Sequence, residues 1–267
     1  MKPLARFSFG VCLCTVAFFL SACAVPRPTA QDHERPPAAW HPQAWKQSLM
    51  ARHEAWKRFE AGYKVRWTDA LERVWRARIL VTASLPEHLR LEILNAWGQV
   101  QGLFLLDRTQ SILWIVPERT VYTSVRQGAL LEKLLGVRLS GTELAPTLLG
   151  LPSEHVLDGA VARRREDETV VLDSEERELA PLRHIRLCAD QERLCRMDFS
   201  DAGTPLFVVF HYEAEGHERD IPTSLTFYSA TGTVELTRTF VRQTARVAPE
   251  TFKLPLLGDA VQVVEIR

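Results

Sequence analysis

The segment that decides the fold runs from His88 to Pro152 and reads HLRLEILNAWGQVQGLFLLDRTQSILWIVPERTVYTSVRQGALLEKLLGVRLSGTELAPTLLGLP. Its first half contains apolar runs of strand length at residues 89–93, 103–106, 112–116 and 120–125. Between the first two runs, Asn95-Ala96-Trp97-Gly98 predicts a turn, because Asn and Gly tolerate the backbone angles that tight turns need. We therefore expect Trp97, a large apolar side chain, at the tip of a turn.

In the second half of this segment the apolar residues change to the spacing of a helix. The leucines that carry this spacing are Leu130, Leu131, Leu134 and Leu135, followed by Leu144, Leu148 and Leu149. Strands followed by apolar helices predict a sheet that is covered by helices.

The residues before this segment predict a helix and two further strands. Residues 42–58 carry Trp45, Leu49 and Trp56 at helical intervals, which is typical of an amphipathic helix packed on a sheet. Residues 59–68 and 75–83 then alternate apolar with polar side chains, as half-buried strands do. The short connections between successive strands favour an antiparallel meander.

After Pro152 the pattern is weaker. Residues 158–186 are densely charged and predict a solvent-exposed pair of hairpins, with a docking patch as the functional alternative. Further strands are expected at residues 182–187, 194–199, 206–212, 224–229, 234–240 and 261–266, the last as an edge strand. With 46% apolar residues in a chain of 267, there is enough apolar surface for one globular domain over residues 42–267.

The amino terminus predicts export from the cytoplasm. Within residues 1–22, Lys2 and Arg6 precede an apolar run at residues 7–20 that is too short for a usual membrane span, as in a signal peptide. Residues 20–23 read Leu-Ser-Ala-Cys and match the bacterial lipobox, in which the Cys thiol receives diacylglycerol and the freed amine is acylated, commonly with palmitate. Cys23 is therefore the predicted lipidation site. An ordinary secretory signal with a chance Cys is the alternative.

The residues after Cys23 predict where the anchored protein goes. Ala24 follows the Cys, whereas Asp at this position signals retention in the inner membrane of enteric bacteria, so the outer membrane is favoured. Residues 23–41 are rich in Pro and predict an extended tether between the lipidated Cys and the folded domain. Several buried acyl chains make such anchoring effectively stable.

Two cysteines remain in the mature domain, Cys188 and Cys195. They flank six residues, a length that suits a hairpin, and the compartment permits disulfides. We predict a disulfide across this hairpin. A redox-active pair is the alternative, but the spacing is far from C-x-x-C.

We find no catalytic constellation in the sequence, because the common nucleophile, metalloprotease and phosphate-binding motifs are missing. A formal net charge of zero and the lack of nucleic-acid motifs argue against DNA or RNA as a partner. His211, Glu213 and His217 form the one suggestive cluster for a metal site, and we favour the alternative, a solvent-facing strand end running into a polar loop. The sequence therefore predicts no enzyme, no cofactor and no metal site.

The order of these motifs resembles the LolB-like outer-membrane lipoproteins of the LolA/LolB lipoprotein-sorting class. The resemblance is carried by Asn95-Ala96-Trp97-Gly98, where the family has an exposed apolar loop residue and a Gly. It is carried further by the helix that ends at Gly136 and by the ending Leu148-Leu149-Gly150-Leu151-Pro152. The charged residues 158–186 look longer than the family's counterpart.

The resemblance implies an α+β fold. A strongly curved antiparallel sheet would form an incomplete β-barrel, covered by helices over an apolar cavity that accepts lipoprotein acyl chains. Trp97 and Ala96 would form the membrane-insertion loop, with Leu85 as a further candidate at a neighbouring tip; the alternative for Trp97 is that it folds inward. The candidates for lining the cavity are Tyr63, Val65, Trp67, Trp75, Ile79, Leu91, Ile93, Leu134 and Leu148.

Two functions follow as expectations from this resemblance. The first is an acceptor on the periplasmic face of the outer membrane of a Gram-negative cell, which takes lipoproteins from a soluble carrier of the LolA type and inserts them into the bilayer. The second keeps the fold and makes the protein an envelope binding module for another amphiphile, such as a glycolipid, or a structural subunit of an envelope complex.

Overall fold

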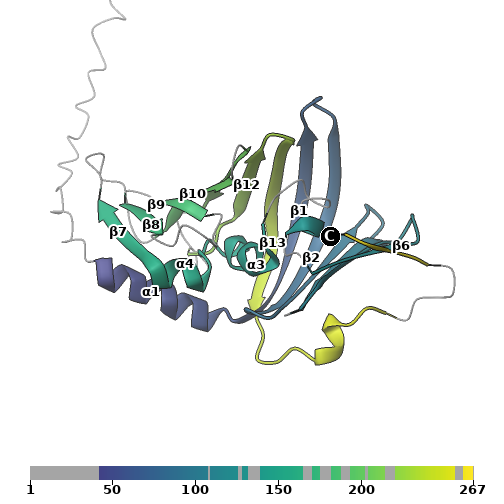
Figure 1. The fold of residues 1–267 in the computed structure, drawn as a ribbon, viewed down its shortest axis with the longest axis horizontal. Helices are drawn as coiled ribbons and strands as arrows, with labels where there is room; N and C mark the ends of the chain where they lie inside the picture. The colour runs from purple at the N-terminus through teal and green to yellow at the C-terminus, as the bar shows by residue number, and fades with distance from the viewer. Residues whose placement is uncertain are drawn as a thin grey trace, which may run out of the picture. The chain divides into compact units, whose positions relative to one another are not determined.

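One large sheet forms the body of the protein (Figure 1). The computed structural model describes residues 42–107, 109–125, 128–131, 139–164, 170–174, 182–187, 193–201, 204–213, 220–255 and 261–266. Within these residues, fourteen strands pair in the order β14-β6-β5-β4-β3-β2-β1-β13-β12-β11-β10-β9-β8-β7. The sheet is open, because β14 and β7 lie at opposite edges. The predicted signal peptide and tether lie outside the described residues, and the chain's internal contacts divide it between Trp40 and His41.

The twelve strands predicted from apolar patterning are all present, and two further strands lie within the charged residues 158–186, where we expected hairpins. Their bounds are β1 Arg58–Asp69, β2 Val74–Ser84, β3 His88–Leu94, β4 Val100–Leu106, β5 Ser111–Ile115, β6 Thr120–Ser124, β7 Ala160–Arg164, β8 Val170–Ser174, β9 Leu182–Leu187, β10 Leu194–Asp201, β11 Thr204–His211, β12 Ser224–Ser229, β13 Gly232–Gln243 and β14 Gln262–Glu265. The helices are α1 Pro42–Ala55, α3 Gly141–Leu148, α4 Glu154–Gly159 and the short 3-10 helix η1 Pro249–Phe252. The predicted first helix ends three residues early, since β1 already begins at Arg58.

Strands β1 to β6 form the expected antiparallel meander. The later strands continue the antiparallel pairing through β13, which lies beside β1. One pairing differs from the expectation of an antiparallel sheet, because the edge strand β14 runs parallel to β6, with Val263 opposite Val121. A parallel pairing cannot be closed by a tight turn, and strands β7 to β13 lie between β6 and β14 in the chain.

The two faces of the sheet differ in burial, and we call the face that carries Phe59, Ala61 and Tyr63 the inner face. These side chains alternate along β1 with the polar Glu60 and Lys64, and the same alternation continues on β2. Figure 1 shows α1, α3 and α4 on one side of the sheet. Trp45 and Leu49 of α1, Leu144 and Leu148 of α3 and Val156 and Leu157 of α4 are buried, as are most inner-face side chains, so helices and sheet share one core.

Helix α3 is fixed at both ends by local hydrogen bonds. At its start, the Ser140 hydroxyl accepts from the Glu143 backbone N–H at 3.2 Å, while the Glu143 carboxylate accepts from the Ser140 backbone N–H at 2.9 Å. This capping box satisfies two N–H groups that a helix start leaves unpaired. Its end is followed by Gly150 at φ +67°, a conformation that favours glycine.

Candidate functional site

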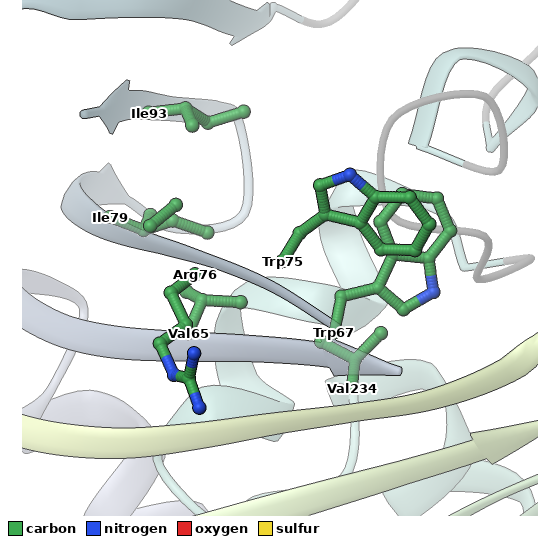
Figure 2. A pocket seen from close by; sticks show the side chains of 8 residues that line it. Val65, Trp67, Trp75, Arg76, Ile79, Ile93 and Val234 are labelled. Atoms are coloured by element: carbon green, nitrogen blue, oxygen red, sulfur yellow. The ribbon is translucent and has the colours of Figure 1, made fainter. Parts of the chain in front are cut away.

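An apolar pocket lies on the inner face, where the β1–β2 hairpin meets β3 and β13 (Figure 2). Its volume is about 110 Å³. All of its lining side chains except one arginine are apolar, and they are Val65, Trp67, Trp75, Arg76, Ala77, Ile79, Ile93 and Val234. A hollow of this composition favours an apolar ligand over a charged one.

The register of the β1–β2 hairpin creates this pocket. Trp67 lies directly opposite Trp75, and Val65 lies directly opposite Ala77. The two indole rings contact each other with their centroids 4.9 Å apart, and Figure 2 shows them together at one side of the pocket. Ala77 has only a methyl group, so the space next to the tryptophans is left open.

The rim of the pocket is partly solvent-exposed. Trp75 keeps 43% of its surface exposed, which is unusual for a tryptophan on the buried face of a sheet. The Arg73 guanidinium lies 5.2 Å from the centre of its ring, within the range of a cation–π interaction. The pocket is therefore an opening in the apolar face rather than a sealed void.

Beside the pocket, one buried hydrogen bond ties the sheet to helix α3. Tyr63 lies opposite Ile79, and its hydroxyl donates to the Leu148 backbone carbonyl at 3.1 Å. Burial raises the pKa of the Tyr63 hydroxyl, because the phenolate form would lose its hydration. The hydroxyl therefore remains a neutral donor and holds the end of α3 over the inner face.

The structure brings five of the cavity candidates together. Val65, Trp67, Trp75, Ile79 and Ile93 line the pocket, whereas Tyr63, Leu91 and Leu148 are fully packed in the neighbouring core. Leu134 lies outside the described residues. Among the described residues the pocket is lined by strands alone, so helices that cover a cavity are a proposal. Whether any of these side chains contacts a lipid stays a prediction.

Sequence reasoning missed Ala77, Arg76 and Val234 as lining residues. Ala77 belongs to the alternation that predicted the second strand, so its side could have been inferred from Trp75 and Ile79. Val234 faces the pocket because β13 pairs with β1, with Val234 opposite Trp67. No local pattern indicates that pairing, since the two residues lie far apart in the chain.

The turn between β3 and β4 presents Trp97 to solvent. The Asn95 side-chain oxygen accepts from the backbone N–H groups of Trp97 and Gln99, each at 3.0 Å, and Gly98 has φ +84°. The Arg78 guanidinium donates to the Ala96 carbonyl at 3.2 Å from the neighbouring strand. These bonds fix the turn, and Trp97 is 81% exposed. It points outward rather than folding inward.

Leu85 does not share this tip. It follows β2 and precedes β3, whereas Trp97 follows β3, so the two turns lie at opposite ends of the same strand. Seven residues of β3 at about 3.4 Å each separate them by roughly 24 Å. The expectation that Leu85 lies at a neighbouring tip is wrong, because successive turns of a meander alternate between the two ends. Leu71, in the β1–β2 turn, is an apolar residue at the Trp97 end and is 72% exposed.

The remaining candidates lie elsewhere. His211 and Glu213 are solvent-exposed, and His217 lies outside the described residues. Among the described residues, no group of three or more His, Cys, Asp or Glu side chains could hold a metal ion. Cys195 is half-buried on β10, but Cys188 lies outside the described residues, so the predicted disulfide between them stays a prediction. In the part of the chain that the structure describes, we find no helix of the length and apolarity that crossing a bilayer requires.

Comparison with solved structures identifies the fold. A LolA superfamily protein of Nitrosomonas europaea aligns with a TM-score of 0.54 at 10% identity, over 78% of this chain and 97% of that chain. A domain classed as an outer membrane lipoprotein-sorting protein, from Vibrio parahaemolyticus, aligns with a TM-score of 0.52 at 12% identity, over 79% of this chain and 97% of that chain. A DUF1329 family protein of Desulfovibrio piger gives 0.55 at 7% identity, over 79% and 96%.

The fold is therefore the open, LolA-like one, as the resemblance in sequence implied. At these identities the likeness shows the fold alone. No family model and no curated protein matches the chain. The likeness accordingly supports the LolA/LolB structural class and does not single out LolB.

Proposed function

We propose that this protein is a lipid-anchored acceptor on the periplasmic face of the outer membrane, which binds lipoprotein acyl chains and passes them to the bilayer in the manner of LolB. The observation that carries this proposal is the apolar pocket on the inner face of a LolA-like sheet, open at the Trp67–Trp75 rim. The lipobox at Cys23 supports the anchor, and the exposed Trp97 supports contact with a membrane.

The size of the pocket sets the strength of binding. A cavity of about 150 Å³ accepts benzene, so about 110 Å³ takes on the order of four carbon atoms. At about 0.8 kcal/mol for each buried CH₂, that segment contributes about 3 kcal/mol. This is enough to hold one part of an acyl chain and too little to hold it permanently. Transfer from a soluble LolA-type carrier, through this protein, to the bilayer then needs only a gradient of affinities and no nucleotide.

Trp97 supplies the contact with the membrane in this proposal. Tryptophan prefers the interface between hydrocarbon and water, and a turn fixed by Asn95 and Arg78 presents it without further reorganisation. The bilayer can then receive an acyl chain close to where it leaves the protein.

Reconstitution tests the proposal. The lipidated full chain is incorporated into vesicles and mixed with a LolA-type carrier loaded with a labelled lipoprotein, and we expect the label to move to the vesicles. A photo-crosslinking amino acid at Ile93, in the pocket, should capture acyl chains during transfer. The same amino acid at Gln243, exposed near the end of β13, is the matched control. If no label moves and Ile93 captures no more than Gln243, the proposal is wrong.

A second candidate function rests on the small volume of the pocket. About four carbons fit a short or branched apolar group as well as a long acyl chain, which favours an envelope binding module for another amphiphile. Mass spectrometry of lipids that co-purify with a Cys23→Ser chain distinguishes the two. Recovery of a glycolipid alone, without acyl transfer, would support this second function.

A further inference from the structure

Four cations lie together on the outer face of the β1–β2 hairpin, opposite the inner face. Lys64 and Arg66 belong to β1, Arg76 and Arg78 belong to β2, and all four side chains are exposed. The register places Lys64 directly opposite Arg78, and Arg66 directly opposite Arg76. Like charges in directly opposite positions destabilise a sheet. The hairpin therefore carries two repulsive pairs side by side.

Little in the surroundings neutralises this charge. Arg66 forms an ion pair with Glu235 of β13 at 3.4 Å, and both side chains are about half exposed, so the pair is weak. Among the described residues, neither Lys64 nor Arg76 has an acidic partner within ion-pair distance. Four cations against the one carboxylate that lines the groove leave three net positive charges. The whole chain has a formal charge of zero, so the excess is local.

These cations surround a groove of about 440 Å³. Its lining residues are Lys64, Val65, Arg66, Arg76, Ala77, Arg78, Asn95, Ala96, Glu235 and Thr237. Asn95 and Ala96 belong to the turn that presents Trp97, so the exposed indole lies next to the cationic groove. Arg76 borders both this groove and the apolar pocket, where Figure 2 labels it among the lining residues.

We propose that this groove binds the phosphate of anionic phospholipid headgroups at a bilayer surface. Guanidinium groups match phosphate oxygens with paired hydrogen bonds, and a bound phosphate would relieve both repulsive pairs at once. The adjacent Trp97 selects a bilayer over a free phosphate as the source, because an indole gains from the interfacial region only when lipid is present. The inference rests on the proposed function for the encounter with a membrane, and it adds the class of lipid recognised there.

Vesicle flotation tests this site. The full chain with Cys23→Ser, which removes the anchor, is mixed with phosphatidylcholine vesicles, with or without phosphatidylglycerol. We expect binding to the phosphatidylglycerol vesicles, weakened by salt, and about thirtyfold weaker binding for the double variant Lys64→Gln, Arg76→Gln. Because this variant removes one cation from each repulsive pair, its thermal stability should not fall. The matched control is Arg246→Gln, Lys253→Gln, which removes two exposed cations outside the groove.

Three results would overturn the proposal. The groove variant binding as tightly as the unaltered chain is the first. The control weakening binding as much as the groove variant is the second, since bulk charge would then explain the effect. The third is displacement of the chain from vesicles by inorganic phosphate at the same concentration as the lipid phosphate. The groove would then be a site for free phosphate. Loss of acyl transfer with headgroup binding intact would count against the proposed function alone.

Discussion

Filling the apolar pocket gives the most direct perturbation of the proposed activity. Ala77 faces the pocket opposite Val65, and Ala77→Leu adds three carbon atoms to a space that takes about four. The bound chain then loses about three buried CH₂ groups, or about 2.4 kcal/mol, so acyl-chain affinity should fall about sixtyfold. The free energy of unfolding should stay the same or rise by up to about 2 kcal/mol, because the new side chain occupies existing space.

The measurement is titration of the full chain, with Cys23→Ser in every variant, against a fluorescent fatty acid, together with urea unfolding. Ala245→Leu is the matched control, because Ala245 is exposed after the end of β13 and the same atoms are added there. Its affinity should equal that of the unaltered chain. If Ala77→Leu unfolds normally and still binds the fatty acid with unchanged affinity, the pocket does not hold the chain and our reasoning from its volume fails.

Three further predictions follow from the hydrogen bonds and exposure of single residues. Tyr63→Phe leaves the Leu148 carbonyl without its donor and should lower the free energy of unfolding by about 1–2 kcal/mol in urea titrations, with the fold unchanged by circular dichroism. Trp97→Ser should change stability by less than about 0.5 kcal/mol, since the side chain is exposed, yet should reduce transfer of lipoprotein to vesicles; equal transfer would contradict its role. Burial lowers the pKa of His53, whose ring donates to the Pro152 carbonyl. As the pH falls, His53 is therefore protonated in the unfolded chain before it is protonated in the folded chain. The contribution of neutral His53 to the free energy of unfolding should be fully present above its ordinary pKa of about 6.5 and should decrease as the pH drops below that value. Urea titrations at a series of pH values should show this decrease, and His53→Gln should flatten it.

The sequence was sufficient to predict the strands and which of their side chains share one face of the sheet. Alternation along residues 59–68 placed Tyr63, Val65 and Trp67 on one side, because a strand has a period of two. The same alternation could not distinguish core from pocket. Leu91 is fully packed and Ile93 lines an opening, although both continue one apolar side of β3. The difference depends on the size of side chains across the sheet, which only the register reveals.

The features that were missed all depend on pairing between distant segments. Val234 reaches the pocket through β13, and the parallel contact of β14 with β6 has no local signature. The cations of the outer face looked like an ordinary solvated side of a strand. That these cations form repulsive pairs is evident only from the register, which places Lys64 opposite Arg78. Trp97 was predicted at a turn tip, and its direction needed the bonds from Asn95 and Arg78.

The contact of β14 with β6 has a consequence for how the chain avoids self-association. Without β14, β6 would be an edge strand with unpaired backbone N–H and C=O groups, and a strand of another molecule could pair with it. β14, which covers this edge, comes after all the other strands of the sheet in chain order. A newly synthesised chain therefore exposes the β6 edge until β14 pairs with it, and removal of the residues from Gln262 onward should favour aggregation.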